Sequence, residues 1–115
     1  MARIEIKGTQ GQIIGTIKSS SMDYTHAVVA VLVNGDEVVQ AMSKSRKGAE
    51  KAAEYARLWA GGSRWANEYR KSTGHTFITA ADLARDAGTK WAAERHAAVE
   101  SGECVLVERI AIVEL

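Results

Sequence analysis

The most constraining feature of the sequence is an apolar run that ends in a turn. Residues Ala27 to Val33 read AVVAVLV, and Asn34-Gly35 follows at once. Because successive side chains of a strand point to opposite faces, a strand of this sequence is apolar on both faces and belongs inside a covered sheet. Asn-Gly tolerates the positive φ angles of a two-residue hairpin turn. The pattern predicts a β-hairpin in which this central strand pairs with Glu37 to Met42.

Three other segments have the patterns of strands. Residues Arg3 to Lys7 alternate polar and apolar side chains, and Gln12 to Lys18 follows after the turn-forming sequence GTQG. The C-terminal segment CVLVERIAIVEL is rich in β-branched residues, with apolar side chains on both faces. These patterns predict two N-terminal strands and a final strand that lies inside the sheet or at a covered edge.

The middle of the chain has the spacing of helices. Ser45 can cap a helix, alanines then recur on one face as far as Trp59, and Gly61-Gly62 marks the end. We therefore expect a helix near 46–60, with Trp59 buried between this helix and the sheet. Ser63 is placed to cap a second, short helix.

A last helical pattern begins at Thr79, and its apolar stripe includes Trp91. Its first residues, TAADLARDAG, are similar to the first half of a bacterial helix-turn-helix. However, Thr89 and Glu94 stand where the recognition helix of that motif needs apolar anchors. The following sequence, TKWAAERHAAVE, is typical of unbroken helix. We expect one long helix near 79–100, with Trp91 buried against the sheet.

These segments together predict a single compact domain of the α+β class over residues 1–115. The expected architecture is an antiparallel sheet of about five strands, four N-terminal and one C-terminal, with two or three helices packed on one face. A chain of 115 residues buries roughly two thirds of its unfolded surface, so its core needs no disulfide or metal.

Composition and motifs argue against several classes of function. The net charge is +1, and the longest apolar run has seven residues against about 20 for a membrane span. An N-terminus without an apolar signal region and a single cysteine, Cys104, predict a cytoplasmic protein. His26, His75 and His96 lack the spacing of a metal site, and no nucleotide-binding or hydrolase motif occurs. We expect a protein that is not an enzyme and has no cofactor and no metal.

Basic charge is concentrated in the middle of the chain. From Lys44 to Lys71 there are eight basic and three acidic residues, whereas the chain from Asp82 onward has four basic and seven acidic ones. Residues 61–75, GGSRWANEYRKSTGH, combine Arg, Trp and Tyr, the residue types that dominate binding energy at interfaces. The candidate binding residues are Arg64, Trp65, Tyr69, Arg70, Lys71, Lys47 and Lys51. The alternative interpretation places Trp65 and Tyr69 in the core and leaves the charges solvated.

A protein partner is the expected target of these residues. In size and composition the chain is similar to small phage-encoded anti-defence proteins, anti-CRISPRs among them, although no motif is shared. The resemblance implies a binding protein that occupies a partner's surface, as an inhibitor or adaptor does. The alternative hypothesis is a nucleic-acid-binding protein that uses the basic region 44–71. A homodimer is compatible with the sequence, and the next candidate surfaces are the loop from Ser19 to Tyr24 and an open sheet edge.

Overall fold

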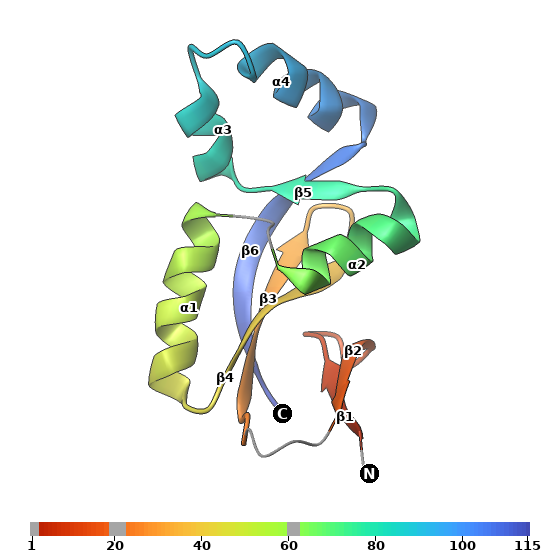
Figure 1. Ribbon diagram of the computed structural model, residues 1–115, viewed down its shortest axis with the longest axis vertical. Coiled ribbons are helices and arrows are strands. Elements are labelled where there is room, and N and C mark those ends of the chain that lie inside the picture. The colour runs from red at the N-terminus through yellow and green to blue at the C-terminus, as the bar shows by residue number, and fades with distance from the viewer. Residues whose placement is uncertain (1–2, 19–22, 60–62) are drawn as a thin grey trace.

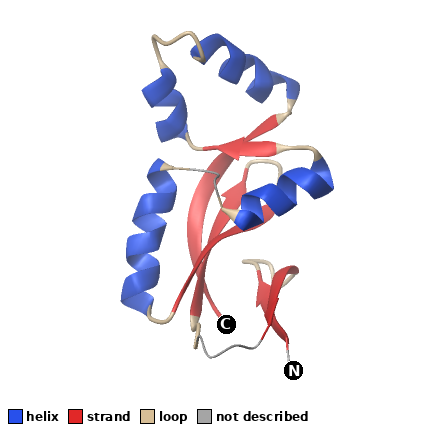
Figure 2. Cartoon of the chain, in the orientation of Figure 1, coloured by secondary structure: helices blue, strands red, loops and turns tan. Residues whose placement is uncertain are grey.

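The computed structural model describes residues 3–18, 23–59 and 63–115, which form six strands and four helices (Figures 1 and 2). The strands are β1 (Arg3–Lys7), β2 (Ile13–Lys18), β3 (His26–Leu32), β4 (Glu37–Ser43), β5 (Thr76–Ile78) and β6 (Cys104–Glu114). The helices are α1 (Arg46–Leu58), α2 (Arg64–Thr73), α3 (Ala80–Asp86) and α4 (Ala92–Ser101). The predicted helix end at Gly61-Gly62 and most of the Ser19 to Tyr24 loop lie outside the described residues.

The α+β class is confirmed, but the predicted sheet is wrong in two respects. The main sheet has the order β4-β3-β6-β5, and β5 runs parallel to β6, so this sheet is mixed and not purely antiparallel. The hairpin β1–β2 forms a separate two-stranded sheet. Strand β5 escaped prediction because its three residues, TFI, are too few to establish a period.

The predicted central hairpin is confirmed. Strand β3 pairs with β4 on one side and β6 on the other, both antiparallel. All residues from Ala27 to Leu32 are at most 5% exposed, as expected of a strand that is apolar on both faces. At the turn, the Gly35 N–H donates to the Leu32 carbonyl oxygen at 3.0 Å, and Gly35 has a φ of 94°, in the region that favours glycine. Asn34 has no positive φ and β4 begins only at Glu37, so the connection is longer than the predicted two-residue turn.

The two faces of the main sheet are covered by different elements. On one face Val28 packs against the buried alanines of α1, which are Ala49, Ala53 and Ala56. The adjacent residue Ala27 points to the other face and packs against Ile6 of β1. Figure 1 shows α1 and the β1–β2 hairpin on opposite sides of the sheet. The β1–β2 hairpin therefore covers part of the second face. The predicted architecture, with helices on one face, contained no such cover for the other face.

The predicted burial of Trp59 and Trp91 is wrong. Trp59 is 51% exposed and Trp91 is 52% exposed. Helix α1 ends at Leu58, and Trp59 has an extended backbone with φ −133° and ψ 117°. Because the backbone leaves the helix there, the alanine face of α1 does not continue to the Trp59 ring. The Trp91 ring is exposed because the helix that was expected to carry it is interrupted.

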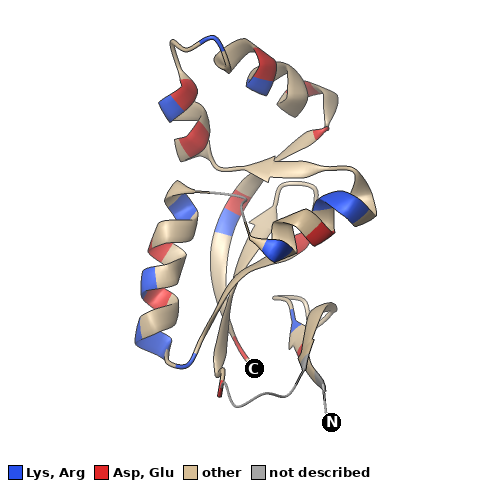
Figure 3. Ribbon diagram, in the orientation of Figure 1, with Lys and Arg blue, Asp and Glu red and all other residues tan. Residues whose placement is uncertain are grey.

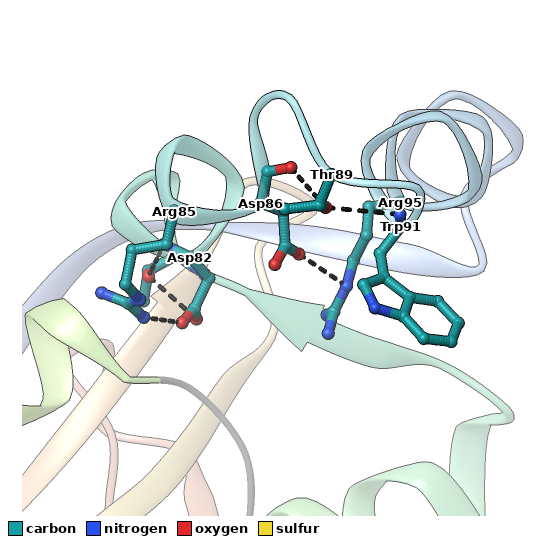
Figure 4. Close-up of polar contacts among 7 residues, drawn as sticks. Asp82, Arg85, Asp86, Thr89, Trp91 and Arg95 are labelled. Carbon is teal, nitrogen blue, oxygen red and sulfur yellow. Dashed lines mark hydrogen bonds and ion pairs between the residues drawn. The ribbon is translucent and has the colours of Figure 1, made fainter.

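The single helix predicted near 79–100 is also wrong, because two helices with a turn between them form instead. Thr79 caps α3 as predicted, with Asp82 completing a capping box. The chain then turns at Gly88, which has a φ of 81°. In that turn the Thr89 hydroxyl donates to the Asp86 carbonyl oxygen at 2.6 Å, and Asp86 pairs with Arg95 of α4 at 2.9 Å (Figure 4).

The α3–α4 pair has the connectivity of a helix-turn-helix but not the surface of a DNA reader. Neither helix contains a fully buried residue. A recognition helix needs a basic face for the phosphate backbone. Helix α4 instead contains Glu94 and Glu100 beside Arg95. None of the described helices has the length and hydropathy required to cross a membrane.

Candidate functional site

The sequence-predicted site is centred on α2, whose residues divide into two groups. Arg64, Arg70 and Lys71 are exposed, whereas Trp65 and Tyr69 are only partly exposed and face the interior. Ser63 caps the helix as predicted, and its hydroxyl accepts from the Ala66 N–H at 3.1 Å. The capped helix thus presents a cationic outer side and an aromatic inner side.

Trp65 is a packing residue. Its ring contacts two hydrophobic clusters, one around Leu32 and Phe77 and the other around Ile6 and Val39. A β-carbon added at Gly15 of β2 would lie 2.8 Å from the ring atom Cζ3, so the ring and the β1–β2 hairpin are in close contact. Trp65 therefore joins α2, the main sheet and the hairpin.

Tyr69 is anchored at both ends of its side chain. Its ring lies edge-on to Phe77 with centroids 5.9 Å apart, and its hydroxyl donates to Asp36 Oδ2 at 2.7 Å. Burial raises the pKa of Tyr69, and the hydrogen bond to the Asp36 carboxylate raises it further. Because Asp36 follows the Asn34-Gly35 turn, Tyr69 fixes α2 to the β3–β4 hairpin.

Lys47 and Lys51 do not join the α2 residues in one surface. On α1 they lie about half a turn away from the buried alanines and so point outward. Acidic residues are interleaved with them, and Glu50 pairs with Arg46 at 3.5 Å. Figure 3 shows basic and acidic positions alternating along α1. The structure brings the five α2 residues together and places the two lysines on another helix.

A buried carboxylate lies beside the inner side of α2. Glu37 is 8% exposed and accepts three hydrogen bonds, from the Thr9 N–H at 2.7 Å, the Thr9 hydroxyl at 2.8 Å and Gln12 Nε2 at 2.9 Å. Burial raises the pKa of Glu37, but these hydrogen bonds and the charge of Arg109 outweigh it, so that the pKa is lowered. All three donors belong to the β1–β2 turn, so this carboxylate holds the hairpin to the sheet.

An exposed surface at the end of α1 was missed by the sequence analysis. Tyr55 is 65% exposed, and Leu58 and Trp59 are each 51% exposed. Arg85 of α3 stacks on the Trp59 ring with its guanidinium carbon 3.9 Å from the ring centroid. Arg85 also donates to the Leu58 carbonyl oxygen and pairs with Asp82. We call Tyr55, Leu58, Trp59 and Arg85 the Trp59 surface.

Part of this surface could have been found from the sequence. Tyr55 and Leu58 fall off the stripe defined by Ala49, Ala53 and Ala56, so helical spacing already places them away from the sheet. The contribution of Arg85 left no local signal, because it lies on another helix.

Histidine and metal-type chemistry have little support in the site. Among the described residues no group of three or more His, Cys, Asp or Glu side chains could hold a metal ion. His75, between α2 and β5, is partly buried, and its Nδ1 has no hydrogen-bond partner in the described part of the chain. The free Cys104 is buried at the start of β6.

No protein-family model matches this chain, and neither a curated protein nor a solved structure does.

Proposed function

We propose that this chain is a non-enzymatic protein-binding domain that uses the Trp59 surface to occupy a partner, as an inhibitor or adaptor does. The observation that carries this proposal is the exposure of three large apolar side chains at the end of one helix. Tyr55 and Leu58 have the i, i+3 spacing that places residues side by side on a helix, Trp59 follows at the C-cap and lines the same groove as Tyr55, and each is at least half exposed. A contiguous apolar patch of this kind marks an interaction site more often than scattered exposed residues do.

The composition and rigidity of the surface support a protein partner. Trp, Tyr and Arg are enriched among the residues that contribute most to protein–protein affinity. Arg85 stacks on the Trp59 ring and donates a hydrogen bond to the Leu58 backbone carbonyl oxygen. These contacts hold the side chains of Arg85 and Trp59 in place before binding. An ordered side chain loses less conformational entropy on association, which favours affinity.

The residues predicted from the sequence have a secondary part in this proposal. Arg64, Arg70 and Lys71 remain exposed and are suited to the polar rim of an interface. Trp65 and Tyr69 support α2 from inside. For nucleic acid as partner, the interleaving of Glu50, Glu54 and Glu68 with the basic residues of region 44–71 is unfavourable, because phosphate contacts need an unbroken cationic track.

Affinity capture from the native host tests the proposal. We would compare the wild-type chain with a triple variant, Tyr55→Ser, Leu58→Ser and Trp59→Ser, and with a control in which the exposed Lys7 and Lys47 become Ser. Protein and nucleic acid in the eluate are scored separately. We expect a protein that is retained by the wild type and the control but lost from the triple variant. Retention of the same protein by all three chains, or capture of nucleic acid in place of protein, would contradict the proposal.

A further inference from the structure

A groove lies directly beside the Trp59 surface, between α1 and the outer side of β4. Its volume is about 460 Å³. Gln40 and Ala41 of β4 form one wall, and Ala52, Ala56 and the aromatic pair Tyr55 and Trp59 form the other. Small side chains thus make the floor, while two aromatic rings stand at one side. This shape suits an inserted apolar side chain.

The β4 wall of the groove also offers main-chain hydrogen bonds. Within the described residues β4 pairs in the sheet with β3 alone, so its other edge has no strand partner there. Trp65 of α2 packs against Val38 and Val39, which leaves the part of this edge from Gln40 onward for an added strand. The pairing register skips Gln40, which is therefore a bulge residue, and its Nε2 is buried without a hydrogen-bond partner among the described residues. A bulge interrupts long strand pairing and so limits an added strand to a short stretch. A rotated Gln40 amide would gain a bond to any carbonyl or carboxylate brought into the groove.

One positive charge borders the groove. Lys51 points outward from α1 but precedes the groove-lining Tyr55 by one helical turn and so borders the groove, whereas Glu50 and Glu54 lie on the other flank of the helix. The Arg64 guanidinium does not serve this groove, because it lies over the Trp65 ring, 4.4 Å from the ring centroid. In the described part of the chain Lys51 forms no ion pair. This unpaired cation at the border of the groove is complementary to an acidic ligand.

We propose that this groove binds a short, extended, acidic peptide segment of the partner protein. An apolar side chain of the peptide packs against Tyr55 and Trp59, a carboxylate lies against Lys51, and the peptide backbone pairs with the β4 edge from Gln40 onward. This assignment rests on the proposed function and specifies the partner's chemistry. A strand edge pairs with the regularly spaced N–H and C=O groups of a peptide backbone. Nucleic acid has no such backbone groups, so the strand edge favours a peptide ligand.

A displayed library of random twelve-residue peptides, selected on the immobilised wild-type chain, tests this assignment. Affinities of the selected peptides are then measured by fluorescence anisotropy for the wild type, Trp59→Ala, Lys51→Glu and Lys47→Glu. The last variant makes the same charge change one helical turn farther from Tyr55 on α1. Because all three positions are exposed, circular dichroism should show an unchanged fold.

We expect selected peptides that combine Asp or Glu with an aromatic or aliphatic residue. Trp59→Ala should weaken their binding about tenfold or more, as loss of a hot-spot residue does. Lys51→Glu should weaken it about fivefold at low salt, and Lys47→Glu less than about twofold.

Three results would overturn the assignment. Neutral or basic peptides that still depend on Trp59 would reject the acidic ligand and leave the proposed function standing. Selection of no peptide, or binding insensitive to Trp59→Ala, would reject the groove as the site. Tighter, Trp59-dependent binding of a labelled oligothymidylate would reject the peptide class and also the protein-binding function.

Discussion

Trp59 and Trp65 lie only six residues apart, yet the structure uses them in opposite ways. Trp65 is packed between two hydrophobic clusters and touches the backbone of β2 at Gly15. Trp59 is half exposed, and the Arg85 guanidinium stacks on its ring. The sequence analysis placed Trp59 in the core, and for Trp65 it left both a binding role and a core position open.

The difference shows what a helical stripe can and cannot predict. Alanines at Ala49, Ala53 and Ala56 correctly place the face of α1 that meets the sheet. That face ends where the helix ends, so the side chain of a tryptophan at the C-cap need not point toward the sheet. Trp65 is interior because the main sheet and the β1–β2 hairpin both pack against it, and the hairpin precedes it by about fifty residues in the chain.

The largest expected effect comes from removing each ring in turn. Trp65→Ala should lower the free energy of unfolding by about 3 kcal/mol, because it opens a space between two clusters. Trp59→Ala should lower it by less than about 1 kcal/mol, because most of the ring is already in water. Urea unfolding followed by circular dichroism measures both values. Equal losses for the two variants would mean that the rings are equally buried.

The next largest effect concerns the carboxylate that holds the hairpin over Trp65. Glu37→Gln should lower the free energy of unfolding by about 2 kcal/mol at neutral pH, because an amide cannot accept all three hydrogen bonds. The matched control is Glu54→Gln on the exposed side of α1, which should change it by less than about 0.5 kcal/mol. A Glu37 variant as stable as this control would contradict the proposed role of the carboxylate.

Acid should have the same effect on the wild type. The pKa of Glu37 is lowered below its ordinary value of 4.5, so its stabilising contribution is complete above that pH and is lost as the pH falls through the lowered pKa. In a variant with Trp59 and Trp91 replaced by Phe, the emission maximum of Trp65 should shift to longer wavelength as the pH falls through the lowered pKa of Glu37, because the hairpin no longer covers the ring. With Trp65 and Trp91 replaced instead, the already exposed Trp59 should change little in the same range.

A smaller effect is expected from crowding the Trp65 ring. Gly15→Ala places a β-carbon 2.8 Å from Cζ3 of that ring, so the hairpin or the ring must shift. We expect a loss of about 1–2 kcal/mol in unfolding free energy, typical of overpacking. Thr16→Ala, at the next and exposed position, is the control. If Gly15→Ala is neutral, the hairpin can shift away from the ring at little cost.

The smallest effect is expected at Tyr69. Tyr69→Phe keeps the edge-on contact with Phe77 but removes the hydrogen bond to Asp36, at a cost of about 1 kcal/mol or less. Thermal unfolding compares it with Tyr55→Phe, whose exposed hydroxyl should be dispensable for stability. Tyr55→Phe should also leave partner binding nearly unchanged, because the ring remains.

Features fixed by neighbouring residues could be predicted from the sequence. The hairpin around Asn34-Gly35, the caps at Ser45, Ser63 and Thr79 and the strand that begins at Cys104 appear as expected, although the hairpin loop is longer than two residues. In each case a local hydrogen bond, a required φ angle or a run of β-branched side chains determines the structure. Such signals do not depend on the rest of the chain.

Features fixed by distant contacts could not be predicted. The three residues of β5 become a strand because β6 lies beside them. The turn at Gly88 had a local signal in the glycine, but alanine spacing on both sides outweighed it in our interpretation. For the candidate site, the exposed cations of α2 were identified, whereas the Arg85–Trp59 stacking joins helices that the sequence keeps apart.

The pairing of β3 with β6 has a consequence for the order of folding. β3 lies between β4, its immediate successor, and β6, which comes after four helices. The β3–β4 hairpin can close early, because its loop is short, whereas closing the β3–β6 ladder must bring together segments from distant parts of the chain. Until β6 docks, one edge of an almost wholly apolar strand stays open to any other chain. We therefore expect this protein's vulnerability to aggregation to be greatest during synthesis and refolding, not in its native state.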